Sequence, residues 1–153
     1  MNRGEKAKKY FLDGYACAQS VVLAFNDILD ISEDDLKKIS IPFGGGLSRL
    51  RLTCGCVSGM AIVIGLLFSD NTNSNDNKAY VYSLVQNITK RFNDEYNTLS
   101  CEELLKKANL KVEIAGKPEI RTDDYYKVRP CTDYVYNSAI ILERFLKEKG
   151  IEL

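Results

Sequence analysis

Residues 53–68 read TCGCVSGMAIVIGLLF, and no charged residue occurs between Leu52 and Ser69. The run is apolar around almost the whole helical circumference, which is typical of a helix that other helices surround. Its length is marginal for a bilayer span, and it contains a serine, a threonine, three glycines and two cysteines. We therefore interpret it as a buried central helix and expect no membrane span.

The segments on either side of this run also have helical patterns. Apolar residues recur at helical spacing over residues 5–12, 15–29 and 79–96, and from about residue 130 to just before Gly150. Ser32 and Ser100 each precede acidic residues in the pattern of a capping box, and each is expected to begin a shorter helix. Residues 110–129 form a long segment without a clear helix or strand pattern, which we call the excursion. The sequence predicts an all-α fold: one domain over residues 1–153, with five to seven helices around a central apolar helix at about residues 53–68.

Composition excludes several classes of function. The 153 residues include 21 lysines and arginines against 21 aspartates and glutamates, so the formal net charge is zero and nothing indicates a nucleic-acid partner. There are no histidines, which removes histidine base catalysis and histidine ligands for zinc or haem. No apolar signal segment follows the charged N-terminal residues, so we expect a cytoplasmic protein, in which thiols stay reduced.

Chemistry must then fall largely to the cysteines, of which the chain has five. Four of them, Cys17, Cys54, Cys101 and Cys131, fall at predicted helix starts. A helix N-terminus offers unpaired N–H groups and a partial positive charge, and both favour the thiolate form. The thiolate is the nucleophile and the metal ligand. The placement indicates reactive or ligating cysteines, although free cysteine is also a common core residue.

Arginines precede two of these cysteines and would add positive charge if their side chains turned inward. Arg49 and Arg51 come before Cys54, and Arg129 comes before Cys131. Because Cys54 also begins the most apolar helix, we expect it to be the attacking thiolate; its resolving partner stays open.

The fifth thiol, Cys56, is interpreted as core packing. It lies among apolar neighbours, and positions two apart on a helix point to nearly opposite faces. Cys54 and Cys56 should therefore not pair unless the segment is still a loop at that point.

Two further features are interpreted as structural. Gly44–Gly46 could present N–H groups to an anion, but it lacks the lysine and serine or threonine of a P-loop, and a close-packed turn is favoured. Tyr125, Tyr126 and Tyr134 could line a pocket near Cys131, but half-buried or exposed packing is favoured.

The spacing of the cysteines matches no common metal signature. There is no C-x-x-C pair, no haem-attachment motif and no ferredoxin-type run. A metal or iron–sulfur cluster held by four separated cysteines stays open, since ligands need only converge in space.

Three stretches resemble a known family: GYACAQS at residues 14–20, FGGG at residues 43–46 and, above all, CGCVSG at residues 54–59. They are similar to the C-GCAxxG-C-C (CGAxxG) family, whose members are described as redox-active, and the resemblance covers most of the chain. The four family cysteines correspond to Cys17, Cys54, Cys101 and Cys131, and some relatives are described as selenoproteins, which fits redox chemistry. The sequence departs from the motif at Cys56, which stands in place of alanine.

The leading hypothesis is a thiol redox protein that uses dithiol/disulfide exchange at these four cysteines, and a thiol–disulfide oxidoreductase is the enzyme class that this hypothesis would imply. A metal or iron–sulfur module with the same four cysteines as ligands is the alternative, and a structural or partner-binding helical domain is the third hypothesis. The implied partner is a redox protein or a small thiol of unknown identity, and a homodimer stays possible.

Overall fold

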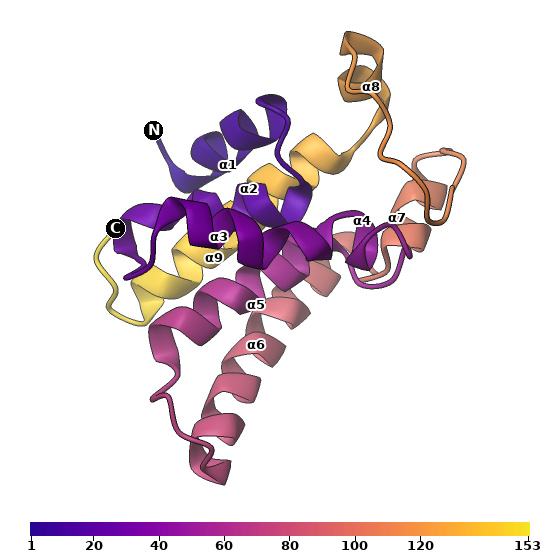
Figure 1. Ribbon diagram of the computed structural model, residues 1–153. Coiled ribbons are helices and arrows are strands. Elements are labelled where there is room, and N and C mark those ends of the chain that lie inside the picture. The colour runs from indigo at the N-terminus through magenta and orange to yellow at the C-terminus, as the bar shows by residue number, and fades with distance from the viewer.

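The computed structural model describes residues 1–153 and contains helices, turns and loops, with no strand beyond one isolated bridge between Thr53 and Ser100 (Figure 1). The predicted all-α class is confirmed. The helices are α1 Arg3–Leu12, α2 Cys17–Leu23, α3 Glu33–Ser40, α4 Gly44–Leu47, α5 Gly55–Phe68, α6 Asn75–Tyr96, α7 Cys101–Lys107, α8 Asp123–Val128 and α9 Cys131–Glu148, with 3₁₀ turns at Asn26–Ile28 and Ile41–Phe43.

Short polar side chains fix where several helices begin. Four hydroxyl oxygens, each at the start of a helix, accept the backbone N–H of the residue three positions later. They belong to Ser32 at α3, Ser74 at α6, Ser100 at α7 and Thr122 at α8. Such caps satisfy N–H groups that have no partner within the helix. The serine caps predicted at Ser32 and Ser100 are both confirmed. Neither forms a full capping box, and the Glu103 carboxylate accepts from the Thr98 hydroxyl instead of the Ser100 N–H.

Helix α5 packs against α2, α6 and α9, as expected of a central apolar helix. Helix α2 is equally central, because every residue from Ala18 to Phe25 is buried. Gly59 permits the close contact of these two helices, since a Cβ atom there would lie 2.9 Å from the Ala18 carbonyl oxygen. The core formed in this way is one continuous cluster that extends from Ala7 to Leu146.

The second predicted helix is shorter than its apolar pattern indicated. It ends at Leu23, not near Leu29, and a 3₁₀ turn follows. Arg3 supplies the physical reason, because its Nη1 donates to the Ala24 carbonyl oxygen at 2.8 Å and its guanidinium also pairs with Asp27. In a continuing helix that carbonyl would accept from Ile28, whose N–H instead donates to Phe25.

Helix α6 packs along α5, and its first turns with the loop before them extend away from the rest of the bundle, whereas α8 and its preceding loop project on another side (Figure 1). Both chain termini lie at one end of the molecule, away from α7 and α8. None of the helices combines the length and the apolar character needed to cross a bilayer.

Candidate functional site

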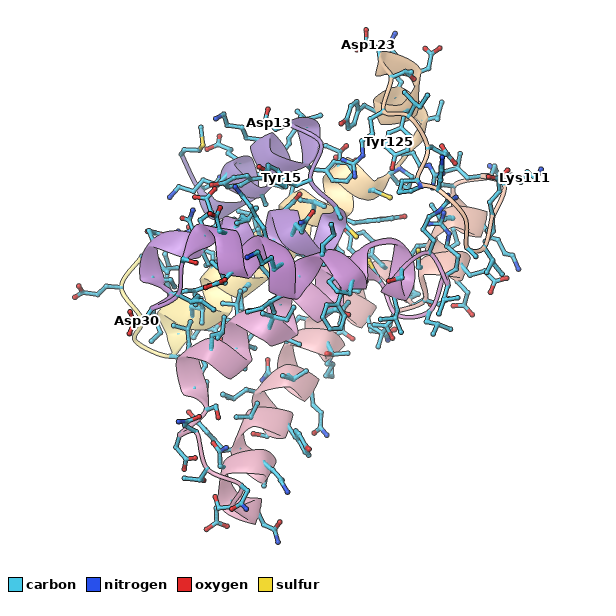
Figure 2. The ribbon with its side chains drawn as sticks, viewed as in Figure 1. Asp13, Tyr15, Asp30, Lys111, Asp123 and Tyr125 are labelled. Carbon is cyan, nitrogen blue, oxygen red and sulfur yellow. The ribbon has the colours of Figure 1, made fainter.

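All five cysteines line one cavity, of about 520 Å³. They come from four separate parts of the chain, and none of them forms a disulfide. Several sulfur atoms lie close together between Tyr125 and the α4 segment (Figure 2). We call this cavity the thiol pocket.

The predicted placement of four cysteines at helix starts is confirmed. Cys17, Cys101 and Cys131 are the first residues of α2, α7 and α9, and Cys54 is the residue that precedes α5. Cys54 and Cys56 are buried, whereas the other three cysteines are partly exposed.

Backbone pairing brings Cys54 and Cys101 together. The Cys54 N–H donates to the Leu99 carbonyl oxygen at 2.7 Å, and the Cys101 N–H donates to the Leu52 carbonyl oxygen at 2.6 Å. These bonds surround the bridge between Thr53 and Ser100, so the starts of α5 and α7 are held against each other.

Glycines make room for the thiols. Gly45 and Gly46 have φ values of 67° and 68°, which glycine adopts without strain, and a Cβ atom at Gly46 would lie 2.6 Å from the Cys101 Cβ. The triple glycine is therefore the close-packed turn that was predicted. A Cβ atom at Gly55 would overlap the Cys17 Sγ.

Cys17 and Cys56 influence each other directly in the pocket. A hydrogen bond from the Cys56 thiol, helped by the Gly45 and Ala18 N–H groups, lowers the pKa of Cys17 to about 6 in spite of its burial. The same contact, together with one to Cys54, raises the pKa of Cys56. The first proton to leave therefore belongs to the pair, and the resulting charge resides on Cys17.

Cys56 is thus more than core packing. It is 1% exposed and belongs to the core cluster, yet its thiol meets the thiols of both Cys17 and Cys54. Positions two apart point to opposite faces only where both lie on the helix, and here only Cys56 does. Cys54 is outside the helix, with φ −50° and ψ 130°, so its thiol can interact with that of Cys56.

Cys101 and Cys131 are held as neutral thiols. Burial raises the pKa of Cys131, and the charges of nearby thiolates add to that effect. Burial also raises the pKa of Cys101, although a hydrogen bond from Arg51 Nη1 to its Sγ, at 3.8 Å, acts in the opposite direction.

Arg49, Arg51 and Arg129, the three arginines noted next to cysteines, all turn inward and line the thiol pocket. Each is at least nine-tenths buried. Sequence reasoning missed a fourth, Arg121, which also lines the pocket and stacks over the ring of Phe11. Arg121 gave no sequence signal because it lies in the long excursion, far from any cysteine along the chain.

The loop that follows α7 folds back over the arginines. The Glu113 carbonyl oxygen accepts from Arg51 Nε at 2.9 Å, and the Ala115 N–H donates to the Arg49 carbonyl oxygen at 2.9 Å. Glu119 pairs with Arg129. These bonds place the excursion at the edge of the pocket.

The half-buried packing predicted for the three tyrosines is confirmed, and two of them also line the pocket. Tyr125 and Tyr134 do line the pocket, while Tyr126 packs on Phe11 and donates to backbone carbonyls of α1. The loop that follows α7 leads along the edge of the pocket, and this places Tyr125 of α8 in the pocket lining.

The residues present do not fit a metal ion. No group of three or more cysteine, aspartate or glutamate side chains is arranged in a way that could hold one. The thiols share one pocket, but their positions are not those of a ligand set.

A comparison with protein-family models gives one match. Residues 15–145 match the family described as "Putative redox-active protein (C_GCAxxG_C_C)". No curated protein and no solved structure gives a significant match.

Proposed function

The chain belongs to the C_GCAxxG_C_C family, and from this premise we propose that it is a thiol–disulfide redox protein whose reacting groups are the cysteines of the thiol pocket. The observation that carries the proposal is the convergence of all five thiols in one cavity, and the lowered pKa of Cys17 supplies a thiolate there near neutral pH. A thiolate next to a second thiol is the arrangement that disulfide exchange needs.

Cys17 takes the attacking role. Its lowered pKa gives a large thiolate fraction at neutral pH, and Cys17 lines the thiol pocket, through which a substrate would reach its sulfur. Cys54, chosen from the sequence because of its neighbouring arginines, is 6% exposed and therefore less accessible. These two observations favour Cys17 over Cys54.

Cys56 takes the resolving role, because its thiol already touches Cys17. The Cys17 thiolate contributes to the high pKa of Cys56. When Cys17 forms a mixed disulfide, that negative charge disappears and Cys56 becomes easier to deprotonate. The Cys56 thiolate can then attack the Cys17 sulfur and release the bound half of the substrate.

The disulfide could also move to other thiols of the pocket, namely Cys54, Cys101 and Cys131. Cys54 lies against Cys56, and Cys101 and Cys131 line the same cavity. A disulfide formed first at Cys17 and Cys56 could pass to Cys54 by exchange, with one S–S bond broken for each one formed. The purely structural hypothesis gives no reason for a stabilised thiolate at Cys17.

Mass spectrometry of the chain purified without oxygen, before and after mild oxidant, tests the proposal. A reversible loss of about two mass units indicates one disulfide, because its formation removes two hydrogens. A chain whose mass does not change, with all thiols still open to alkylation after unfolding, would contradict it. A mass that already includes a metal would instead make the cysteines ligands.

A further inference from the structure

We propose that the thiol pocket takes a small anionic disulfide, a low-molecular-weight compound that carries carboxylate or similar anionic groups beside its S–S bond. This inference rests on the proposed redox function and specifies its substrate class. It follows from the charges that line the cavity.

The charged lining is strongly one-sided. Four arginines and one glutamate line the cavity: Arg49, Arg51, Arg121, Arg129 and Glu119. The glutamate is already paired with Arg129. An anion would therefore enter a positive, partly desolvated cavity, in which charge attraction is stronger than at an open surface.

Arg49 has donor capacity that the protein leaves unused. Its Nη2 atom is buried without a hydrogen-bond partner, and the nearest carboxylate oxygen, on Glu113, is 3.9 Å away. That distance is too long for a hydrogen bond. A buried guanidinium N–H without an acceptor is unfavourable, and a carboxylate bound in the pocket would supply that acceptor.

The other arginines are fixed but retain donors. Arg51 uses Nε for the Glu113 carbonyl and Nη1 for the Cys101 sulfur, and Arg121 uses Nη1 for the Phe11 carbonyl. Each guanidinium has five N–H donors, so these bonds hold the side chains in place while other N–H groups stay available. An arginine held in this way recognises a carboxylate with little loss of side-chain entropy.

The size of the cavity favours a small molecule over a protein segment. Its volume of about 520 Å³ is in the range typical of small-molecule sites, about 300–1,000 Å³. The loop that follows α7 also covers the arginine side of the pocket through its bonds to Arg49 and Arg51.

The bonds, protons and electrons of the reaction balance between the chain and its substrate, without a further reagent. The Cys17 thiolate attacks one sulfur of the substrate, the S–S bond of the substrate breaks, and one half leaves as a thiolate that takes a proton. Cys56, as a thiolate after losing its proton, attacks the Cys17 sulfur and releases the second half. The substrate disulfide gains two electrons, and the two protein thiols are oxidised to one disulfide.

Three disulfides with the same two-carbon arms test the inference: dithiodipropionate, which is anionic, bis(hydroxyethyl) disulfide, which is neutral, and cystamine, which is cationic. We expect the reduced chain to react in that order at low ionic strength, with a difference of at least about tenfold between the two ends. Added salt should reduce the advantage of dithiodipropionate. Equal rates, or the reverse order, would overturn the inference even though the redox function stood.

Arg49→Gln should lower the rate with dithiodipropionate more than the rate with bis(hydroxyethyl) disulfide, so that the ratio of the two moves toward one. Arg144→Gln is the matched control, because Arg144 is exposed and lies outside the pocket, so this substitution removes the same charge elsewhere. If Arg49→Gln does not fold, the order of the three disulfides on the unaltered chain still decides.

Calorimetry with dithiodipropionate and the Cys17→Ser chain separates the two proposals, because binding then needs no reaction. Binding that salt weakens would support an anion site even if no disulfide were reduced. The inference would be overturned if the Cys17→Ser chain showed no measurable binding at millimolar dithiodipropionate and the three disulfides also failed to react in the expected order.

Discussion

Gly55 and Cys17 approach each other so closely that position 55 has no space for a side chain. A Cβ atom there would overlap the Cys17 sulfur and lie 2.7 Å from the Phe43 carbonyl oxygen. Gly55 is the first residue of α5, so the absence of its side chain brings the whole helix start against Cys17. The glycine of the CGCVSG stretch therefore shapes the environment of a cysteine far from it in the sequence.

Gly55→Ala should displace Cys17 and destabilise the fold. Overpacking of this kind costs about 1–3 kcal/mol, and the Phe43 carbonyl cannot move aside as a flexible side chain could. We expect a lower free energy of unfolding in urea, and slower alkylation of Cys17 at pH 7 because its contact with Cys56 is disturbed. Gly65→Ala, on the same helix with nothing within 4 Å, is the control. It should be neutral or stabilising by up to about 1 kcal/mol.

Cys56→Ala should raise the pKa of Cys17 from about 6 toward the ordinary value of a thiol, because it removes the hydrogen bond that lowers it most. The thiolate fraction at pH 7, and with it the alkylation rate of Cys17, should fall by about tenfold or more. Alkylation of the Cys17 peptide, followed by mass spectrometry between pH 5 and 9, measures this. An unchanged pKa would mean that backbone N–H groups and arginine charge dominate instead.

The stability of the fold should depend on pH through Cys17. A group whose pKa is lower in the folded chain makes the unfolded chain bind more protons between the two pKa values. The difference in unfolding free energy between the unaltered chain and Cys17→Ser should therefore rise from pH 6 to about pH 9, by at most about 1.4 kcal/mol per pH unit, and become independent of pH below pH 6. The chain has no histidine to titrate in the lower part of this window. A flat difference in urea titrations would count against a stabilised thiolate.

Arg51→Gln should make Cys101 less reactive. Arg51 opposes the effect of burial on the Cys101 thiol through a hydrogen bond and its charge, so its removal should raise the pKa of Cys101 further. We expect several-fold slower alkylation of the Cys101 peptide at pH 8, while Arg144→Gln should leave it unchanged. Faster alkylation would mean that Arg51 shields the thiol more than it activates it.

Local chemistry made much of the fold predictable. The apolar run of α5 and the serine caps at Ser32 and Ser100 depend on nearby residues alone, and all of them appear as expected. The early end of α2 was not predictable, because it depends on Arg3, which is distant in the sequence and takes the Ala24 carbonyl.

The same distinction applies to the site. Four cysteines were identified by their positions at helix starts, which is a local property. The contact between Cys17 and Cys56, and the inward position of Arg121, depend on how α2, α5 and the excursion pack together, and no spacing in the sequence encodes it.

Cys56→Ser should separate attack from resolution. The serine hydroxyl can still donate a hydrogen bond to the Cys17 sulfur, so Cys17 should remain a reactive thiolate at pH 7. Serine cannot form the second disulfide, and the reaction with bis(hydroxyethyl) disulfide should therefore stop at a mixed disulfide on Cys17. Intact mass spectrometry would detect the retained half of the reagent, whereas Cys101→Ser and Cys131→Ser chains should release it. A Cys56→Ser chain that still released it would assign the resolving role to another cysteine, with Cys54, the next thiol in contact with Cys56, as the first to test.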